Sequence, residues 1–318
     1  MNILKEIENI GIIPVVCIND SAKAENLAKA LIDGGLPAAE ITFRTDAAED
    51  SIRKISAAYP EMAVGAGTVL TIGQADAAVK AGAKFIVSPG FNPKVVSWCV
   101  GNDIPVLPGC TTASEIEQAI ELGLGTVKFF PAEQSGGLAK IKALSAPYSH
   151  MKFMPTGGIS PANMHEYLSF KKIIACGGSF MVKNEYIDSE NWAAITAAAK
   201  ETVAALLDFK PAHIGINSDN AAATAQRITS IFGGQIENET EKGMFAGGFF
   251  EIMKQFSGGK CGHIAVSTPN VERAVYYLKK RGAAFDEESA KFAPDGSLKF
   301  IYLSNDFDGF KIHLVEAE

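Results

Sequence analysis

The sequence lacks several features that would point to whole classes of protein. Lysine and arginine total 29 against 36 acidic residues, so the formal net charge is −7. Because an acidic surface repels phosphate backbones and anionic lipids, we expect neither a nucleic-acid nor a membrane partner. No apolar run approaches the roughly 18 residues of a membrane span. The first residues show no signal-peptide pattern, and we therefore expect a cytoplasmic protein.

Cysteine is scarce and unpaired along the chain. The five cysteines lie far apart without Cys-x-x-Cys spacing, at positions 17, 99, 110, 176 and 261. Most of them lie in apolar runs, which is typical of buried free thiols in a reducing compartment. A glycine-rich nucleotide fingerprint is also absent after the first expected strand, and this disfavours an open dinucleotide-binding sheet.

Over its first two thirds, the sequence alternates regularly between short apolar runs and alanine-rich amphipathic segments. This alternation predicts eight strands, each followed by a helix, and hence an all-parallel sheet. Eight is the number that closes a (β/α)8 TIM barrel, which we favour over an open doubly wound sheet. The expected strands cover residues 11–18, 38–44, 62–69, 84–90, 104–109, 126–131, 152–158 and 173–179. Expected helices include 21–33, 71–81, 112–122 and 160–169, with capping residues such as Thr71, Thr112 and Ser160.

A domain boundary is expected where a last helix near residues 190–208 runs into Lys210 and Pro211. Proline ends the helix, and a new strand pattern starts at once. We therefore expect one domain over residues 1–209 and a second, smaller domain over residues 210–318.

The second domain contains an internal repeat. Residues 212–233 and 262–282 each open on a strand with histidine, carry asparagine seven residues later, and end a helix at glycine. Further strands follow each copy and end in 248–255 and 309–316. The pattern predicts an α+β domain built from two βαβββ-like repeats.

Three charged residues of the expected barrel strands share its interior. Alternate residues of a strand face opposite sides, so Glu40 and Arg44 of one strand and Lys128 of another point inward. Burial lowers the pKa of a lysine, and a neutral amine attacks carbonyl groups to form a Schiff base. Glu40 would then carry protons and Arg44 would bind the carboxylate of a keto acid. The alternative is a buried ion network that only plugs the barrel.

Two glycine-rich loops follow the seventh and eighth expected strands, where barrels often bind phosphate through backbone N–H groups. They are residues 155–160, with Gly157 and Gly158, and residues 176–180, with Ser179. Either loop alone would also suit an ordinary turn.

Six motifs in order resemble the 2-keto-3-deoxy-6-phosphogluconate / 4-hydroxy-2-oxoglutarate aldolases over about residues 1–208. They are EITFRT (40–45), GAGTV (65–69), SPG (88–90), KFFPAE (128–133), PTGGIS (155–160) and GGS (177–179). The resemblance implies a class I aldolase, a metal-independent lyase without cofactor, on a (β/α)8 barrel that forms a homotrimer. It implies catalytic roles for Lys128 as the Schiff-base lysine and Glu40 as the proton shuttle. The implied substrate-binding residues are Arg44, Thr68, Pro89, Phe130, Thr156, Gly157, Gly158 and Ser179.

The implied reaction cleaves 2-keto-3-deoxy-6-phosphogluconate to pyruvate and glyceraldehyde 3-phosphate. A second implied substrate is 4-hydroxy-2-oxoglutarate, which gives pyruvate and glyoxylate. The C-terminal repeat resembles vicinal-oxygen-chelate (glyoxalase-like) modules, which would make His213, Glu251, His263 and His313 candidate metal ligands. Two alternatives stay open: a non-catalytic sensor of a sugar-acid phosphate, and a bifunctional enzyme with metal-dependent chemistry in its second domain.

Overall fold

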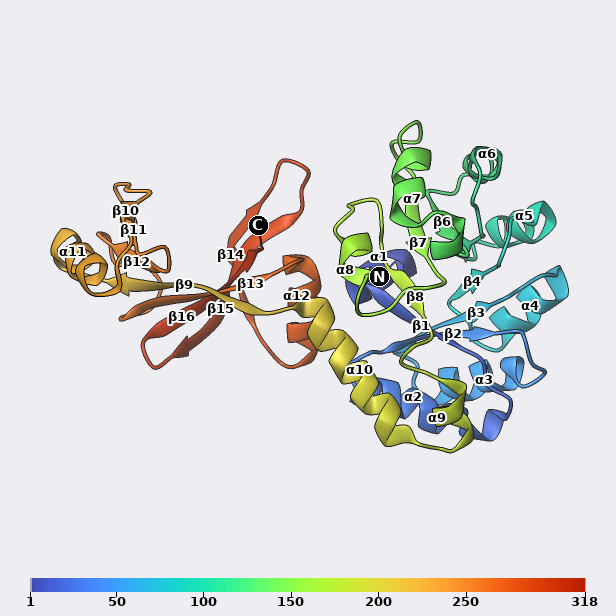
Figure 1. The fold of residues 1–318 in the computed structure, drawn as a ribbon. Coiled ribbons are helices and arrows are strands. Elements are labelled where there is room, and N and C mark those ends of the chain that lie inside the picture. The colour runs from blue at the N-terminus through green and yellow to red at the C-terminus, as the bar shows by residue number, and fades with distance from the viewer. Residues whose placement is uncertain (1, 318) are drawn as a thin grey trace. The chain divides into compact units, whose positions relative to one another are not determined.

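The computed structural model describes residues 2–317, and its chain divides into two compact units (Figure 1). The N-terminal unit ends at Leu206, and the C-terminal unit begins at Leu207. Strands and helices alternate in the first unit, whereas the second is built on a single eight-stranded sheet.

Eight short parallel strands form the centre of the N-terminal unit. Six of them pair in the order β5-β4-β3-β2-β1-β8, and β6 pairs with β7. Isolated parallel bridges join Gly109 to Lys128 and Thr156 to Gly177, which link the β6–β7 pair to both ends of the six-stranded sheet. The strands are β1 (Ile12–Val16), β2 (Ala38–Thr42), β3 (Ala63–Gly67), β4 (Phe85–Val87), β5 (Val106–Leu107), β6 (Thr126–Phe129), β7 (Lys152–Pro155) and β8 (Cys176–Gly178). The predicted parallel βα alternation is confirmed, but each strand is shorter than expected.

Helices surround these strands and bury apolar faces against them (Figure 1). Leu27 and Leu31, one turn apart in α2, are both fully buried, as the helical period requires. The helices are α1 (Ile3–Ile10), α2 (Ala24–Asp33), α3 (Ala48–Ala58), α4 (Ile72–Lys80), α5 (Pro93–Gly101), α6 (Ala113–Glu121), α7 (Gly137–Ser145), α8 (Met164–Leu168), α9 (Asn184–Asp188) and α10 (Trp192–Leu207). Short 3-10 turns, η1 (Ser21–Lys23) and η2 (Glu133–Ser135), precede α2 and α7.

Two of the three expected helix caps are confirmed. The Thr71 hydroxyl accepts a hydrogen bond from the Gln74 amide, and Thr112 forms a capping box with Glu115. The expectation that Ser160 caps a helix is wrong, because α8 begins only at Met164. The Ser160 amide donates to the Asn163 side chain instead, so residues 160–163 form a turn.

The C-terminal unit is an eight-stranded sheet in which each half has the order strand, helix and three strands. The sheet order is β10-β11-β12-β9-β13-β16-β15-β14, with the antiparallel β9–β13 pair at its centre. The first half contains β9 (Lys210–Asn217), α11 (Ala221–Phe232), β10 (Ile236–Glu237), β11 (Gly243–Ala246) and β12 (Phe250–Met253). The second contains β13 (Gly262–Thr268), α12 (Val271–Lys280), β14 (Phe285–Phe292), β15 (Leu298–Phe307) and β16 (Phe310–Glu316).

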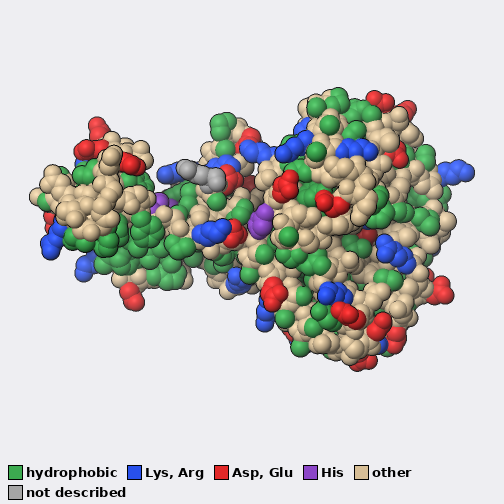
Figure 2. Space-filling model, viewed as in Figure 1, with side chains coloured by type: hydrophobic (Ala, Val, Ile, Leu, Met, Phe, Trp, Pro, Cys, Tyr) green, Lys and Arg blue, Asp and Glu red, His purple; other side chains and the backbone are tan. Residues whose placement is uncertain are grey.

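The two faces of this sheet differ in chemistry. Met244 and Ile252 face one side and pack with Ala225 of α11 in a buried apolar cluster. Their strand neighbours Phe245 and Glu251 therefore face the other side, where polar side chains gather. Figure 2 also shows hydrophobic side chains at the surface of this unit, where Phe232 is 71% exposed.

The free thiols follow the expectation only in part. None of the five cysteines forms a disulfide, and Cys99, Cys110 and Cys176 are buried as predicted. Cys261 is exposed, because it lies in the loop before β13 rather than in a strand. Among residues 2–317, no helix combines the length and apolarity needed to cross a membrane.

Candidate active site

The side chains of Lys128 and Glu40 meet inside the N-terminal unit. Lys128 lies on β6 and Glu40 on β2, and every residue of both strands is buried. Lys128 Nζ donates a hydrogen bond to Glu40 Oε1 over 3.2 Å, and the two side chains are only 6% and 1% exposed. Glu40 Oε2 has no hydrogen-bond partner among the described residues. Because a buried oxygen without a partner is costly, Oε2 is the atom that would accept a proton, or a hydrogen bond from a hydroxyl group, of a bound substrate.

Gly67 provides the space for the Glu40 carboxylate. The two residues lie on the neighbouring strands β2 and β3, where Thr42 is paired with Gly67. A Cβ atom at position 67 would lie 2.6 Å from Glu40 Cγ and 2.8 Å from Cδ, well inside normal contact distance. A side chain at position 67 is therefore incompatible with the observed Glu40 rotamer.

A pocket of about 350 Å³ opens beside the Lys128–Glu40 pair. Lys128 Nζ lies 5.1 Å from the centre of the Phe130 ring, and Phe130 lines the pocket. Of the ten predicted site residues, six line it: Arg44, Phe130, Thr156, Gly157, Gly158 and Ser179. Lys128 and Glu40 do not themselves line the pocket, and Phe130, which does, lies beside the Lys128 amine.

Thr68 and Pro89 follow the ends of β3 and β4, but they do not line the pocket. Thr68 follows β3 with a left-handed backbone (φ 57°), and Pro89 follows β4. Arg44 was expected within a strand, but β2 ends at Thr42 and Arg44 lies in the turn that follows. Arg44 still lines the pocket, because the turn follows directly after the strand that carries Glu40.

The loop after β7 is shaped to bind an anion. Gly157 (φ 101°) and Gly158 (φ 77°) both have left-handed backbone conformations that side chains disfavour. Within residues 2–317, the Gly158 amide N–H donates to no other group of the chain, whereas the parallel bridge between Thr156 and Gly177 directs the Gly157 N–H toward the Gly177 carbonyl. Since Gly158 lines the pocket, its N–H group is free to bind a phosphate oxygen there.

Several pocket residues were missed from the sequence. Val15 and Cys17 alternate on and just after β1, so the period-two pattern that identified Glu40 could also have identified them. Ile159 is contiguous with the glycine pair. No sequence pattern could have identified Asn184, because it begins α9 and only the tertiary fold brings it to the pocket.

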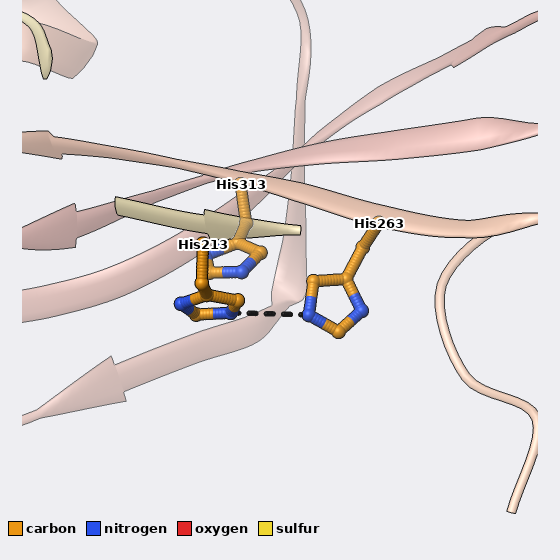
Figure 3. Close-up of side chains that lie close together, drawn as sticks. All are labelled: His213, His263 and His313. Atoms are coloured by element: carbon orange, nitrogen blue, oxygen red, sulfur yellow. Dashed lines mark hydrogen bonds between the residues drawn. The ribbon is translucent and has the colours of Figure 1, made fainter. Parts of the chain in front are cut away.

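A second cluster of polar side chains lies in the C-terminal unit. His213 on β9, His263 on β13 and His313 on β16 point toward one another (Figure 3), with one ring nitrogen of each within 4.8 Å of the others. The Nε2 atoms of His213 and His263 are 3.2 Å apart. Glu251 Oε2 lies 3.0 Å from His263 Nε2 and 3.3 Å from His213 Nε2. The four residues named from the sequence therefore lie together.

The protonation of this cluster follows from its environment. Hydrogen bonds from His213 and then His263 lower the pKa of Glu251 to about 2, so its carboxylate is ionised at neutral pH. Burial lowers the pKa of His313 to about 3, so its imidazole is neutral.

The register of the sheet relates the four residues as two equivalent pairs. Glu251 pairs with Gly215, two residues after His213, and His313 pairs with Ala265, two residues after His263. Gly215 also leaves space for the His263 ring, since a Cβ atom there would overlap its Cε1, Nδ1 and Nε2 atoms.

Comparison with known proteins identifies relatives of the N-terminal unit. Residues 3–198 match the family model described as KDPG and KHG aldolase. The 2-dehydro-3-deoxy-phosphogluconate aldolase of Treponema pallidum is 45% identical over 203 residues, which are 64% of this chain and 97% of that protein.

Solved structures give the same result. The Legionella pneumophila KDPG aldolase, with pyruvate captured as a covalent carbinolamine, aligns with a TM-score of 0.61 and 36% identity over 63% of this chain and 97% of that one. The Zymomonas mobilis 2-keto-3-deoxy-6-phosphogluconate aldolase with 3-phosphoglycerate aligns with a TM-score of 0.59 and 38% identity over 63% and 94%. The family match ends at residue 198, so the C-terminal unit lies outside it.

Proposed function

The chain belongs to the KDPG and KHG aldolase family, and on that premise we propose that it cleaves 2-keto-3-deoxy-6-phosphogluconate to pyruvate and glyceraldehyde 3-phosphate. Such an aldolase is a carbon–carbon lyase that acts through a Schiff base. The observation that carries the proposal is the buried Lys128 amine, 3.2 Å from Glu40 and beside a pocket of keto-acid size. We also propose cleavage of 4-hydroxy-2-oxoglutarate to pyruvate and glyoxylate, because the same keto-acid half reacts in both substrates.

The reaction begins when Lys128 Nζ gives up a proton, for which Glu40 is within hydrogen-bond reach. The amine attacks the C2 carbonyl, and Glu40 returns its proton to the departing hydroxyl, so that loss of water from the carbinolamine leaves a protonated iminium and an ionised Glu40. Glu40 then accepts the proton of the C4 hydroxyl while the C3–C4 bond breaks, and the electron pair moves into the iminium to give an enamine and an aldehyde. Return of a proton to C3 and addition of water release pyruvate and restore the amine.

Substrate orientation follows from the two ends of the pocket. The Arg44 guanidinium would hold the carboxylate of the keto acid in its planar fork, and Phe130 would cover the apolar pyruvate portion. The free amide group of Gly158, with Thr156, Gly157 and Ser179, would bind the phosphate. Thr68 and Pro89, which do not line the pocket, would contact the pyruvate portion next to Lys128 and Glu40.

The finer architecture belongs to the same proposal. The bridges from Gly109 to Lys128 and from Thr156 to Gly177 favour a closed (β/α)8 barrel over an open sheet. We assign residues 1–209 to this barrel and residues 210–318 to a vicinal-oxygen-chelate-like module, supported by the same order of elements in its two halves. Resemblance to the family favours a homotrimer.

Reductive trapping tests the aldolase. Pyruvate and borohydride should attach irreversibly to Lys128 in the full chain, and mass spectrometry of a digest should locate the adduct. Lys128→Met should lose both the adduct and turnover, whereas Lys152→Ala, on the neighbouring strand β7, should keep both. An adduct on another lysine, or turnover by Lys128→Met, would contradict the proposal. A protein that binds but never cleaves would favour the non-catalytic sensor.

The histidine cluster favours a second function, metal-dependent chemistry in the C-terminal unit. Three imidazoles and one carboxylate, with donor atoms this close, suit a first-row divalent transition metal. His213, Glu251, His263 and His313 would hold the ion, which would act as a Lewis acid when bound. The absence of a side chain at Gly215 fits this assignment, because it leaves room for the His263 ring beside the other donors.

Cobalt(II) titration followed by visible absorption tests this second function. The full chain should bind about one equivalent with bands of a coordinated site. His263→Ala and Gly215→Ala should both weaken binding, the second without removing a donor. The exposed His150 lies outside the cluster, so His150→Ala should bind as the wild type does. Binding unaffected by His263→Ala would refute the assignment.

A further inference from the structure

Two carbonyl groups of the glycine loop at residues 155–160 accept hydrogen bonds from the segment that follows β6, which leaves the Gly158 amide as its free donor. The Thr156 carbonyl accepts a hydrogen bond from the Ala132 amide at 2.8 Å. The Gly157 carbonyl accepts one from the Glu133 amide at 3.2 Å. Both donors belong to the segment that follows β6, so this segment sets which way the peptide groups of the glycine loop point.

Glu133 is itself held in place by a buried tyrosine. Its side chain packs against Gly158, where a Cβ atom would lie 2.7 Å from Glu133 Cβ. The hydroxyl of Tyr167, on α8, donates a hydrogen bond to Glu133 Oε1, and Tyr167 is only 1% exposed. Gly137 leaves room for this contact, since a Cβ atom there would lie 3.2 Å from the Tyr167 hydroxyl.

We propose that Tyr167 and Glu133 form a positioning pair that orients the 155–160 loop toward the phosphate of the substrate, an inference that rests on the function proposed above. Neither residue lines the pocket, so the pair acts through the peptide groups of Gly157 and Gly158. Glu133 is otherwise exposed, and without the Tyr167 hydroxyl its side chain is free to rotate away from Gly158. Burial and the contact with Glu133 raise the pKa of Tyr167, so its hydroxyl remains a donor at every pH at which the protein would be assayed.

The pair predicts a specific effect on substrate choice. A substrate with phosphate uses the oriented amide groups, whereas 4-hydroxy-2-oxoglutarate has no phosphate to place there. Loss of the pair should therefore weaken binding of the phosphorylated substrate alone, and leave the chemistry at Lys128 unchanged. A general loss of structure would instead lower activity on both substrates.

The test compares Tyr167→Phe with a matched control in the full chain. Tyr148 also donates its hydroxyl to a glutamate, Glu117, at 2.9 Å, but this pair is exposed and Glu117 lies outside the segment that contacts the glycine loop. Tyr167→Phe should raise KM for 2-keto-3-deoxy-6-phosphogluconate about fivefold to tenfold, the effect of one lost hydrogen bond, with kcat within about twofold. KM for 4-hydroxy-2-oxoglutarate should not change. Tyr148→Phe should match the wild type on both substrates, and Glu133→Gln, which keeps an acceptor oxygen, should restore most of the affinity that Glu133→Ala loses.

A binding measurement separates this inference from the proposed reaction. Inorganic phosphate is titrated into each protein and followed by phosphorus NMR, while borohydride trapping with pyruvate reports on Lys128. Weaker phosphate binding in Tyr167→Phe, with normal trapping, supports the pair even if the wild type proves unable to cleave the sugar acid. Equal phosphate affinity in Tyr167→Phe and wild type, or parallel losses on both substrates, overturns it.

Discussion

Substitution of Gly67 by alanine should separate the catalytic geometry from the stability of the fold. Gly67 is buried at the end of β3, and its added Cβ would point at the Glu40 carboxylate on β2. The new atom would lie 2.6 Å from Glu40 Cγ. Carbon atoms pack at about 3.5–4 Å, so the Glu40 side chain must retreat by about 1 Å.

A retreat of this size is enough to break the contact with Lys128. The Lys128 Nζ–Glu40 Oε1 hydrogen bond is already 3.2 Å long, near the upper limit of useful geometry. Displacement of a catalytic group by about 1 Å can cost on the order of 100-fold in rate. The atoms that must move belong to a side chain and not to the backbone, so Gly67→Ala should still fold.

The assay is steady-state cleavage of 2-keto-3-deoxy-6-phosphogluconate, with borohydride trapping as a second measurement. We expect kcat to fall about 100-fold, as for a misplaced proton carrier. Trapping of pyruvate on Lys128 should be slower but still detectable, because the amine itself is not displaced. Gly101→Ala is the matched control, since a Cβ atom there meets nothing within 4 Å and α5 accommodates alanine.

Two results would refute this reasoning. A Gly67→Ala enzyme with the kcat of the wild type would show that Glu40 tolerates displacement, and so does not act at the observed position. A Gly67→Ala protein that unfolds well below the wild type would show that the strands, and not the carboxylate, absorb the clash. Circular dichroism melting curves distinguish the two.

Further predictions concern stability and the reactivity of thiols. Gly65→Ala should lower the free energy of unfolding by about 2 kcal/mol in a denaturant titration, because the added Cβ overlaps the fully buried ring of Phe85. Thr112→Ala should cost about 1 kcal/mol by the same measurement, through loss of the capping box with Glu115; an unchanged midpoint would show that the cap contributes nothing. Iodoacetamide at pH 8 should label the exposed Cys261 and spare Cys99 and Cys110, since burial raises the pKa of these thiols to about 11 and about 12 and keeps them protonated. Peptide mass mapping would contradict this if Cys110 were labelled as fast as Cys261.

The part of the site that the sequence predicted is the part that depends on the alternation of side chains along strands. Alternation along two strands was enough to place Lys128 and Glu40 on the inside, and the structure brings them into hydrogen-bond contact. The same alternation was also applied to Arg44, but β2 ends two residues before it, so the rule does not hold there. Arg44 nevertheless lines the pocket from the turn that follows β2. Local motifs likewise predicted the caps at Thr71 and Thr112, but not the turn at Ser160, where a side-chain hydrogen bond from another part of the loop decides the conformation.

The sequence by itself therefore determined which strands carry the reactive side chains and which way those side chains point, because both depend on neighbours a few residues away. Only the tertiary structure decided which distant residues touch. The Tyr167 hydroxyl on Glu133, the space that Gly67 leaves for Glu40, and the three histidines from strands β9, β13 and β16 are contacts between segments far apart in the chain. Such contacts depend on sub-ångström packing between whole elements, which no local pattern encodes.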